Sequence, residues 1–468
     1  MKKKVSILRI LLAAVICSSS TLISLSNSLA QVTNETANTI LIENVRIIVG
    51  DGSVIESGHV EFANGEITRV ATGAAAAERR VNKTIINGEG KTLMPALIDA
   101  HSHLGYQGRN SWGSQNYGIE NLIDNLQQYA YYGFSAVFSA GSDAPNIVRA
   151  VENSRRSGEF VGAQLLFAAG MAPPGQGPNN QFLSHALAVE EASGETILYG
   201  LENPEQAQAQ VGIAAGKGIQ FIKIWVDDRG GSQLKLSAAI YAAVIQEADR
   251  LGLKVFVHQQ SASDIPALLS AGAHGFLHGR IGPEYTGRIA NQTRSSGAFV
   301  IPNWGLGELR QEAIGEDDFL NDIFAEEVMS PLSGNTSRRS VTVTRNPNTE
   351  TELTASFRNI INAGVDIVLG TDAGAVPDHH FGYTGHRELE IYVRLGMTPM
   401  QALVAGTSNA ARHLGLENRG QLKTGLSADL ILLQQNPLED IRNTRSIELV
   451  YLAGVEVERG QLQQQWKP

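Results

Sequence analysis

Five side chains of metal-binding type and one lysine lie at or near the ends of short apolar segments, spread over more than half of the chain. They are His101, His103, Lys223, His258, His278 and Asp372. Alternating side chains along a β-strand place His101 and His103 on the same face, where both can bind one ion. The alternative is that these two histidines cap a strand near solvent. Because the chain has only 11 histidines, a same-face pair at a strand end favours metal binding.

Each of the other four residues has a structural and a chemical interpretation. Lys223 lies inside an apolar segment, where a lysine needs a partner unless its face of the strand is wet. His258 and His278 each end an apolar run, and singly each fits a core histidine as well as a ligand. Asp372 fits the N-cap of a helix, or a metal ligand that accepts a proton from an attacking water. Their shared position at strand ends favours one common metal site and predicts a metal-dependent hydrolase.

The elements that must position these residues alternate between short apolar strands and helical patterns. Eight strands are expected, the number that a (β/α)₈ barrel needs, and such barrels keep their active site at the carboxyl ends of the strands. The expected strands are Ala96–His101, Ala136–Ala140, Ala163–Ala169, Phe221–Val226, Lys254–His258, Gly275–His278, Ala298–Asn303 and Asp366–Gly370. The expected helices include Glu120–Tyr132, Ile147–Gly158, Pro204–Gly216, Leu236–Leu251, Ala262–Ala271 and Leu353–Ala363.

Two other regions depart from this rhythm. The long polar segment Glu308–Glu352 after the seventh strand is expected to be an active-site cover or a disordered insertion. Both chain ends carry brief strands separated by turn signals, so we expect residues 31–94 and 415–468 to form one small β-sandwich. The α/β barrel, residues 95–414, would be inserted between these two halves.

The first 30 residues have the composition of a signal peptide. A basic stretch that includes Lys2 and Arg9 precedes an apolar core, Ile10–Ile16, and small residues before Ala30 suit cleavage there. The apolar core is too short to span a membrane, so no stable membrane insertion is expected after cleavage. The only cysteine, Cys17, lies in this segment, so the mature chain would have no disulfide. The expected location is periplasmic or secreted.

The charge of the chain bears on its partners. Removal of residues 1–30 would change the formal charge from −10 to −14, because it takes away four basic residues and no acidic one. No cluster of lysine and arginine remains, so nucleic acid is not an expected partner. The expected partner is a small-molecule substrate, and the sequence is compatible with a homo-oligomer.

These residues, in this order, resemble the amidohydrolase superfamily, and in particular its imidazolonepropionase-like and prolidase-like members. The resemblance covers residues 39 to 457. It rests on Met94–His103, Phe221–Ile224, Leu277–Gly279, Gly370–Gly374, Gly385–Glu390 and Ala428–Leu433. Three positions depart from the pattern: Ala96 replaces a common glycine, Gln260 stands where many relatives have a second histidine, and the loop Trp225–Gly231 differs from that of the prolidase-like members.

The resemblance implies a barrel beside a small β-domain, and a site for two divalent ions, usually zinc. It assigns His101, His103 and Asp372 to one ion and His258 and His278 to the other. Lys223, carboxylated by CO₂, would bridge them. The ions would activate a water molecule, and Asp372 would take its proton and return it to the leaving amine.

Substrate choice depends on the loops that follow the strands. Arg229 is a candidate for binding a substrate carboxylate, although an ion pair with Asp227 or Asp228 explains it equally well. Trp304, Tyr106 and the loop Asp378–Tyr383 are candidates for lining an apolar pocket. His379, His380 and His386 are expected on its rim, where they would touch substrate or solvent.

These residues favour hydrolysis of a C–N bond in a small N-acyl amino acid or dipeptide, with the Xaa-Pro type included. Two alternatives stay open. One is a hydrolase of a cyclic amide or lactone from the same superfamily, and the other is a non-catalytic periplasmic binding protein on the same scaffold.

Overall fold

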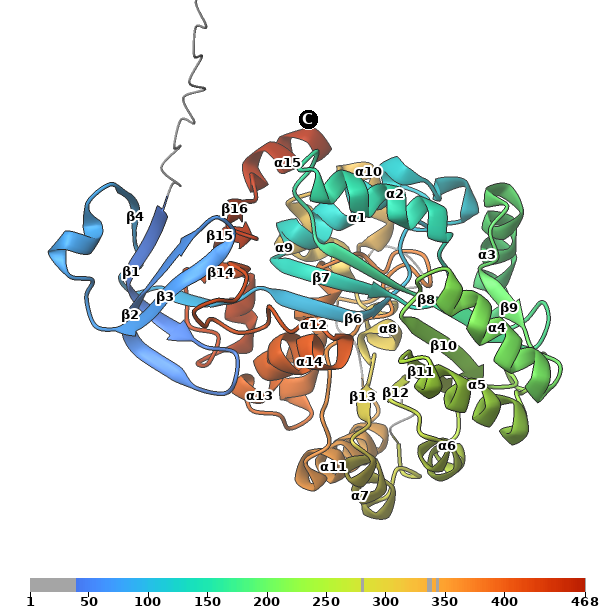
Figure 1. Cartoon of the computed structure of the whole chain (residues 1–468). Helices are drawn as coiled ribbons and strands as arrows, with labels where there is room; N and C mark the ends of the chain where they lie inside the picture. The colour runs from blue at the N-terminus through green and yellow to red at the C-terminus, as the bar shows by residue number, and fades with distance from the viewer. Residues whose placement is uncertain (1–38, 279–281, 335–338, 342–344, 468) are drawn as a thin grey trace, which may run out of the picture. The chain divides into compact units, whose positions relative to one another are not determined.

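Strands from both chain ends form one eight-stranded mixed sheet in the computed structural model, which describes residues 39–278, 282–334, 339–341 and 345–467 (Figure 1). Strand β5 (Thr92–Pro95) lies in its middle, parallel to β1 (Thr39–Ile48) and antiparallel to β14 (Leu430–Leu433). The remaining strands are β2 (Val54–Ala63), β3 (Glu66–Thr72), β4 (Lys83–Asn87), β15 (Ile447–Leu452) and β16 (Val455–Glu456). The expected pairing of the two chain ends is confirmed.

A second sheet of parallel strands forms most of a barrel, in the order β13-β12-β11-β10-β8-β7-β6. Its strands are β6 (Leu97–Ser102), β7 (Phe134–Ser139), β8 (Gln164–Ala172), β10 (Phe221–Val226), β11 (Lys254–Gln259), β12 (Gly275–Leu277) and β13 (Phe299–Ile301). Each coincides with an expected strand to within a few residues. A short strand that was not expected, β9 (Leu198–Gly200), pairs with the C-terminal end of β8.

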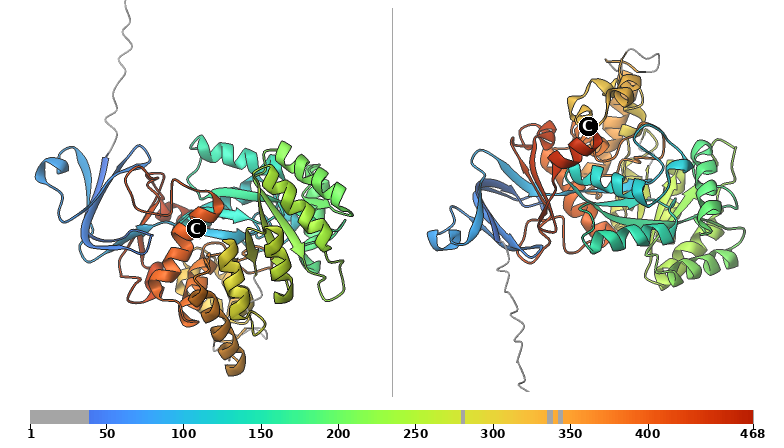
Figure 2. Two further views of the ribbon diagram at one scale, coloured as in Figure 1. Left: turned by 60° about the horizontal axis from the view of Figure 1, so that its bottom comes forward. Right: turned by 90° about the horizontal axis from the view of Figure 1, so that it is seen from above.

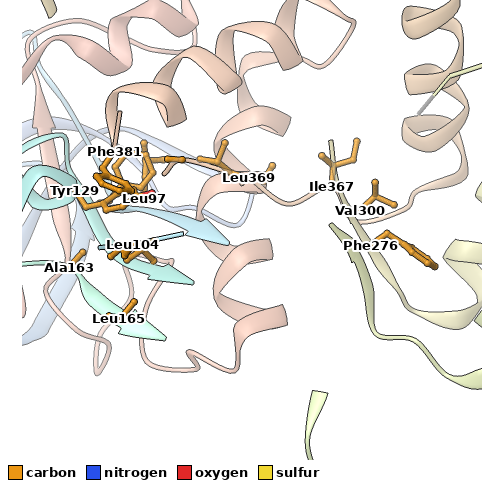
Figure 3. Packing of buried hydrophobic residues seen from close by; sticks show 14 of the residues in the cluster. Leu97, Leu104, Tyr129, Ala163, Leu165, Phe276, Val300, Ile367, Leu369 and Phe381 are labelled. Atoms are coloured by element: carbon orange, nitrogen blue, oxygen red, sulfur yellow. The ribbon is translucent and has the colours of Figure 1, made fainter. Parts of the chain in front are cut away.

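Residues 366–370, the expected eighth strand, close the barrel as an extended segment with few regular ladder contacts. The amide of Val300 in β13 donates to the carbonyl of Asp366 at 3.0 Å, and the amide of Ala100 in β6 donates to the carbonyl of Leu369 at 2.9 Å. In Figure 3, Ile367 lies beside Val300 while Leu369 faces Leu97. The segment therefore bonds to both open edges of the sheet, and the barrel is nearly closed.

Helices follow most of the strands and surround the barrel (Figure 2). They are α1 (Ile119–Tyr131), α2 (Pro145–Arg156), α3 (Asn180–Ser193), α4 (Pro204–Gly216), α5 (Ala238–Arg250), α6 (Ile265–Ala271), α7 (Gly287–Ser296), α11 (Pro347–Ala363), α12 (Tyr383–Arg394), α13 (Pro399–Val404), α14 (Ala410–Leu414) and α15 (Arg459–Trp466). Helix α4 has its expected bounds, since the Asn203 side chain accepts from the amide of Gln206 and Pro204 is the first helical residue. Helix α3 was not expected.

Helix α8 (Gly305–Glu308) ends at the first residue of the segment Glu308–Glu352. Before α11 begins, the described part of the segment contains the short helices α9 (Asp318–Asn321) and α10 (Glu326–Met329) and the 3₁₀ turns Ile314–Glu316 and Ser330–Leu332. Ion pairs hold the segment to neighbouring elements: Glu312 to Arg387 of α12 at 2.7 Å, and Asp317 to Arg445 at 2.8 Å. Its described residues are therefore docked against the barrel, which supports a cover more than a disordered insertion.

The expected signal peptide, residues 1–30, lies outside the described residues, and so does Gly279. The expected boundaries at residues 94/95 and 414/415 stay predictions. Within the part of the chain that the structure describes, no helix is long and apolar enough to cross a membrane.

Candidate metal centre and its cavity

All six residues singled out at strand ends lie on the same side of the barrel. His101 belongs to β6, Lys223 to β10 and His258 to β11, whereas His278 follows β12 and Asp372 follows the segment 366–370. The strands are parallel, so their carboxyl ends meet at one face of the barrel, where barrel enzymes keep their active sites. The sequence-based placement of the site is consistent with this geometry.

His101, His278 and Asp372 form a compact group of potential ligand atoms. Asp372 Oδ1 lies 3.3 Å from His101 Nε2 and 3.2 Å from His103 Nε2, and Asp372 Oδ2 lies 3.5 Å from His278 Nε2. Asp372 Oδ1 is nevertheless buried without a hydrogen-bond partner among the described residues. Buried carboxylate oxygens are normally satisfied, so a convergent set of nitrogen and oxygen atoms with an orphaned acceptor fits a metal ion.

Burial sets the protonation of this group. It lowers the pKa of His101 well below its ordinary value and that of His278 to about 4, so both rings are neutral near pH 7. Neutral imidazole is the form that binds a metal ion. Burial also lowers the pKa of Lys223 to about 7, although the Asp372 carboxylate opposes the shift. Lys223 Nζ lies 3.3 Å from His101 Nε2, at the edge of the group.

Asn303, in the loop after β13, orients two of these residues. Its Oδ1 lies 2.9 Å from His101 Nδ1 and accepts from the amide of His278 at 3.3 Å. An amide oxygen only accepts, so His101 Nδ1 donates and the lone pair of Nε2 is free to bind an ion between it and Asp372. Asn303, His278 and Asp372 all have positive φ angles, of 54°, 58° and 61°. Such backbone strain at three neighbouring positions is typical of functional sites.

Asp99 connects the first strand to the segment that carries Asp372. Its Oδ1 accepts from the amides of His101 and Thr371, both at 3.1 Å, and its Oδ2 accepts from the hydroxyls of Tyr129 at 2.8 Å and Thr371 at 2.6 Å. Asp99 is fully buried. It therefore fixes the backbone at His101 and next to Asp372, on the two sides of the position where the barrel closes. The only sequence signal was an acid inside an apolar strand, two residues before His101.

His258 is held differently from the other histidines. Its Nε2 lies 2.9 Å from Asp227 Oδ2, so Nε2 is engaged and only Nδ1 is left to face an ion. Its ring packs edge-on against His278, with the ring centroids 4.9 Å apart. The structure thus groups His278 with His101 and Asp372, whereas the resemblance assigns it to the ion of His258. The division of ligands between two ions stays a prediction.

A cavity of about 340 Å³ opens over this group. Its metal-site walls are His103, Lys223, His258, His278 and Asp372, and its other walls include Phe182 and Gln181 of α3, Trp225, Arg229, Gln260, Leu306, Arg310 and Val376. Helix α3 and the segment that follows β13 therefore complete a site whose floor is the barrel. Gln260, which replaces a histidine of many relatives, faces this cavity.

The four residues proposed for substrate contact have different positions. Arg229 lines the cavity, but its guanidinium also pairs with Asp227 at 3.0 Å, as the alternative interpretation held. Tyr106 packs behind Phe182 and donates to the carbonyl of Ser142 at 2.7 Å. Trp304 packs against Phe357, with ring centroids 4.7 Å apart. Neither Tyr106 nor Trp304 is among the residues that line the cavity.

The structure does not bring His386 to the cavity. It is fully buried in α12, with Nδ1 2.9 Å from the Thr444 hydroxyl and Nε2 2.8 Å from the Tyr132 carbonyl. Both ring nitrogens are occupied, so His386 joins α12 to the C-terminal segment. His379 and His380 are also buried rather than exposed on a rim.

A family model described as the amidohydrolase family matches residues 92–457 of the chain. Ochratoxinase from Aspergillus niger is 23% identical over 428 residues, which cover 85% of this chain and 81% of the ochratoxinase. Among solved structures, a Xaa-Pro dipeptidase with bound methionine in the active site aligns with a TM-score of 0.69 and 21% identity, over 90% of this chain and 99% of that one. A putative prolidase from Bifidobacterium longum aligns with a TM-score of 0.66 and 23% identity, over 92% and 99%.

The family model covers most of the chain, including both the barrel and the C-terminal strands β14 and β15. The structural likenesses, all below 25% identity, support the fold. The residues matched by the model also contain the buried histidine and aspartate group of the metal-site candidate. The chain therefore belongs to the amidohydrolase family, whose members are metal-dependent hydrolases acting on carbon–nitrogen bonds.

Proposed function

We propose that this protein is exported and hydrolyses the amide bond of a small N-acyl amino acid or dipeptide, with Xaa-Pro dipeptides included. The observation that carries the proposal is the cavity of about 340 Å³ directly above His101, His278 and Asp372. A cavity of this size is at the lower end for small-molecule sites, and its walls combine apolar and cationic side chains. Such walls suit a small substrate that has an apolar group and a carboxylate.

Two divalent ions, with zinc as our choice, would lower the pKa of a water molecule and polarise the scissile carbonyl when bound at this centre. The chain's own residues would manage the protons. Asp372 has two carboxylate oxygens among three imidazoles, which places a base beside the floor of the cavity. It would accept the proton of the water and return it to the leaving amine.

Lys223 is proposed to carry a carboxylate formed with CO₂. Its pKa of about 7 leaves much of the amine neutral, and a neutral amine can form a C–N bond to CO₂ with release of a proton. The product would be an anionic oxygen ligand on a side chain whose Nζ lies 3.3 Å from His101 Nε2. Mass spectrometry of the native protein tests this, because carboxylation adds the mass of CO₂ to an unmodified chain.

The names of several similar proteins support the substrate class. Xaa-Pro dipeptidase and prolidase describe structural neighbours, and one of these neighbours is complexed with N-methylphosphonate-L-proline. At 19–23% identity, these likenesses concern the fold and not the residues of the cavity. The support is therefore for small amide substrates as a class.

A substrate screen with a matched pair of variants tests the proposal. Metal-loaded protein would be assayed with Xaa-Pro and other dipeptides, N-acyl amino acids, cyclic amides and lactones. Asp372→Asn should lose at least about 100-fold in kcat, the scale of a lost general base. Asp264→Asn, at a partly exposed acid that pairs with Lys235 at 2.6 Å and does not line the cavity, should retain most activity.

Three outcomes would contradict parts of this proposal. Near-full turnover by Asp372→Asn with metal bound would exclude its role as base. Hydrolysis of lactones or cyclic amides alone would move the substrate class to those compounds. Less than about one equivalent of metal per chain after expression with zinc would favour the alternative of a non-catalytic binding protein on this scaffold.

Export rests on the sequence of residues 1–30. The basic start, short apolar core and small residues before Ala30 are those of a cleaved leader. Fractionation of the native host followed by N-terminal sequencing should find a periplasmic or secreted chain that begins at Gln31. A cytoplasmic chain with an intact N-terminus would exclude export.

A further inference from the structure

Three cationic side chains line the cavity, and two of them already have partners. Lys223 lies at the metal-site candidate, 3.3 Å from His101 Nε2. Arg229 pairs with the buried Asp227 carboxylate at 3.0 Å and donates to the carbonyl of Gly177 at 2.8 Å. Since Asp227 also contacts His258, Arg229 is committed to supporting the metal site. The third cation is Arg310, in the segment after α8.

Arg310 makes no hydrogen bond or ion pair with any residue that the structure describes, although it has acidic neighbours. Each of these acids is paired with a different arginine. Glu308 pairs with Arg345 at 2.8 Å and with Arg394, and Glu312 pairs with Arg387 at 2.7 Å. The acids two residues before and two residues after Arg310 are thus paired with other arginines.

The surroundings of Arg310 are also cationic. Arg339 is largely buried nearby, and the charge of Arg310 adds to the effect of burial in lowering the pKa of Arg339. Arg339 has its own partners, the carbonyls of Leu309 and Glu312 at 2.7 and 3.0 Å and the Asp378 carboxylate at 3.7 Å. An anion beside Arg310 would relieve this repulsion, which favours a negatively charged ligand at that wall of the cavity.

We propose that Arg310 binds the free carboxylate of the substrate at the wall of the cavity that it shares with the metal-site candidate. Its guanidinium offers a planar fork that matches the two oxygens of a carboxylate. Leu306 and Val376 lie in the same cavity and would contact the apolar part of the substrate. The assignment differs from the sequence-based candidate, Arg229, because Arg229 is held by Asp227. It rests on the proposed function for the identity of the ligand as an acyl amino acid or dipeptide.

The test compares ligands that differ only in the presence of the carboxylate. A dipeptide or N-acyl amino acid and its carboxamide would be assayed with the metal-loaded wild type, Arg310→Gln and Arg229→Gln. Arg442→Gln is the control, since Arg442 is an exposed arginine paired with Asp440 and far from the cavity lining in sequence. The readout is the ratio of KM for the acid to KM for the carboxamide, a quantity that a general loss of folding would not change.

The expected result is a preference of the wild type for the acid that Arg310→Gln reduces about tenfold, the scale of a lost charge-assisted hydrogen bond. KM for the carboxamide should change less than about twofold. The preference should also weaken at high salt, because Arg310 is exposed to solvent. Equal values for acid and carboxamide in the wild type, or an unchanged ratio in Arg310→Gln, would overturn the assignment. Loss of the preference in Arg229→Gln alone would transfer the role to Arg229 and overturn it too.

A binding measurement separates this inference from the proposed function. If the wild type hydrolyses none of the amides, the proposed function fails, and calorimetric titration with an N-acetyl amino acid and its carboxamide still tests Arg310. Selective binding of the acid that disappears in Arg310→Gln would support the anion site without amide hydrolysis. Equal binding of the two ligands would exclude it.

Discussion

Removal of the Asp99 carboxylate should weaken the contact between β6 and the segment 366–370, where the barrel closes next to the metal-site candidate. Asp99 accepts hydrogen bonds from two backbone amides, those of His101 and Thr371, and from two hydroxyls. In Asp99→Ala, the His101 amide and the Tyr129 hydroxyl would be buried without this acceptor, whereas the Thr371 amide would keep the His101 carbonyl at 3.0 Å. A buried unsatisfied group costs about 1–3 kcal/mol, so the free energy of unfolding should fall by about 2–6 kcal/mol.

Asp99→Asn should recover at least half of this loss. An asparagine Oδ1 can accept from both amides, while its amide group faces hydroxyls that can rotate to accept. A carboxylate and an amide have nearly the same shape, so the rescue would show that the hydrogen bonds matter rather than the volume of the side chain. The same variants should rank in the same order for metal content, because Thr371 precedes Asp372 and His101 is itself a candidate ligand.

The assay is denaturant unfolding followed by fluorescence, together with metal analysis of the purified variants. Asp264→Ala is the control, since Asp264 pairs with Lys235 at 2.6 Å on a partly exposed surface, and such pairs contribute about 0–1 kcal/mol. An unfolding midpoint for Asp99→Ala equal to that of Asp264→Ala would refute the role of Asp99. So would a full loss of metal in Asp99→Asn with no loss in Asp99→Ala.

Two further predictions concern neighbouring positions. Gly374 has a φ of 83°, and a Cβ there would lie 2.0 Å from the carbonyl oxygen of His103, so Gly374→Ala should lower the thermal midpoint and the metal content. The control is Gly73→Ala, since Gly73 has a similar φ of 74° but no atom within 4 Å of the added Cβ, so it should lower the free energy of unfolding by only about 1–2 kcal/mol. Equal thermal midpoints for the two variants would contradict the clash at Gly374. Burial raises the pKa of Asp143 to about 7, so the folded state holds a proton that the unfolded chain releases near pH 4. Stability should therefore fall as pH rises from 4 to 7, by up to about 1.4 kcal/mol per pH unit, and a slope that persists in Asp143→Asn would exclude Asp143 as its source.

Strand placement was predictable because it depends on local pattern. Phe221–Val226 and Pro204–Gly216 have their expected bounds, since an apolar run and a proline-started helix are encoded by adjacent residues. The segment Asp366–Gly370 has the same apolar character, yet it is held by one isolated bridge to β13, between Ile367 and Val300, and by a backbone hydrogen bond from Ala100 of β6 to Leu369. How regularly the last strand of a barrel pairs depends on the closure of the whole sheet, and no local pattern records that.

The sequence alone determined which residues are candidates for the chemistry. The spacing of His101 and His103, and the placement of Lys223, His258, His278 and Asp372 at strand ends, required only the alternation of side chains and the parallel order of strands. These are short-range properties of the chain.

Only the tertiary structure decided how the residues act together. Asn303 is 202 positions from His101, yet it fixes the ring nitrogen that faces Asp372. Asp227 pairs with Arg229 and also contacts His258, so Arg229 supports the position of His258. Of the three cations that line the cavity, Arg310 is the one without a partner among the residues that the structure describes. Hydrogen bonds between side chains depend on distances of a few tenths of an ångström between distant segments, and these distances are set by packing rather than by spacing along the chain.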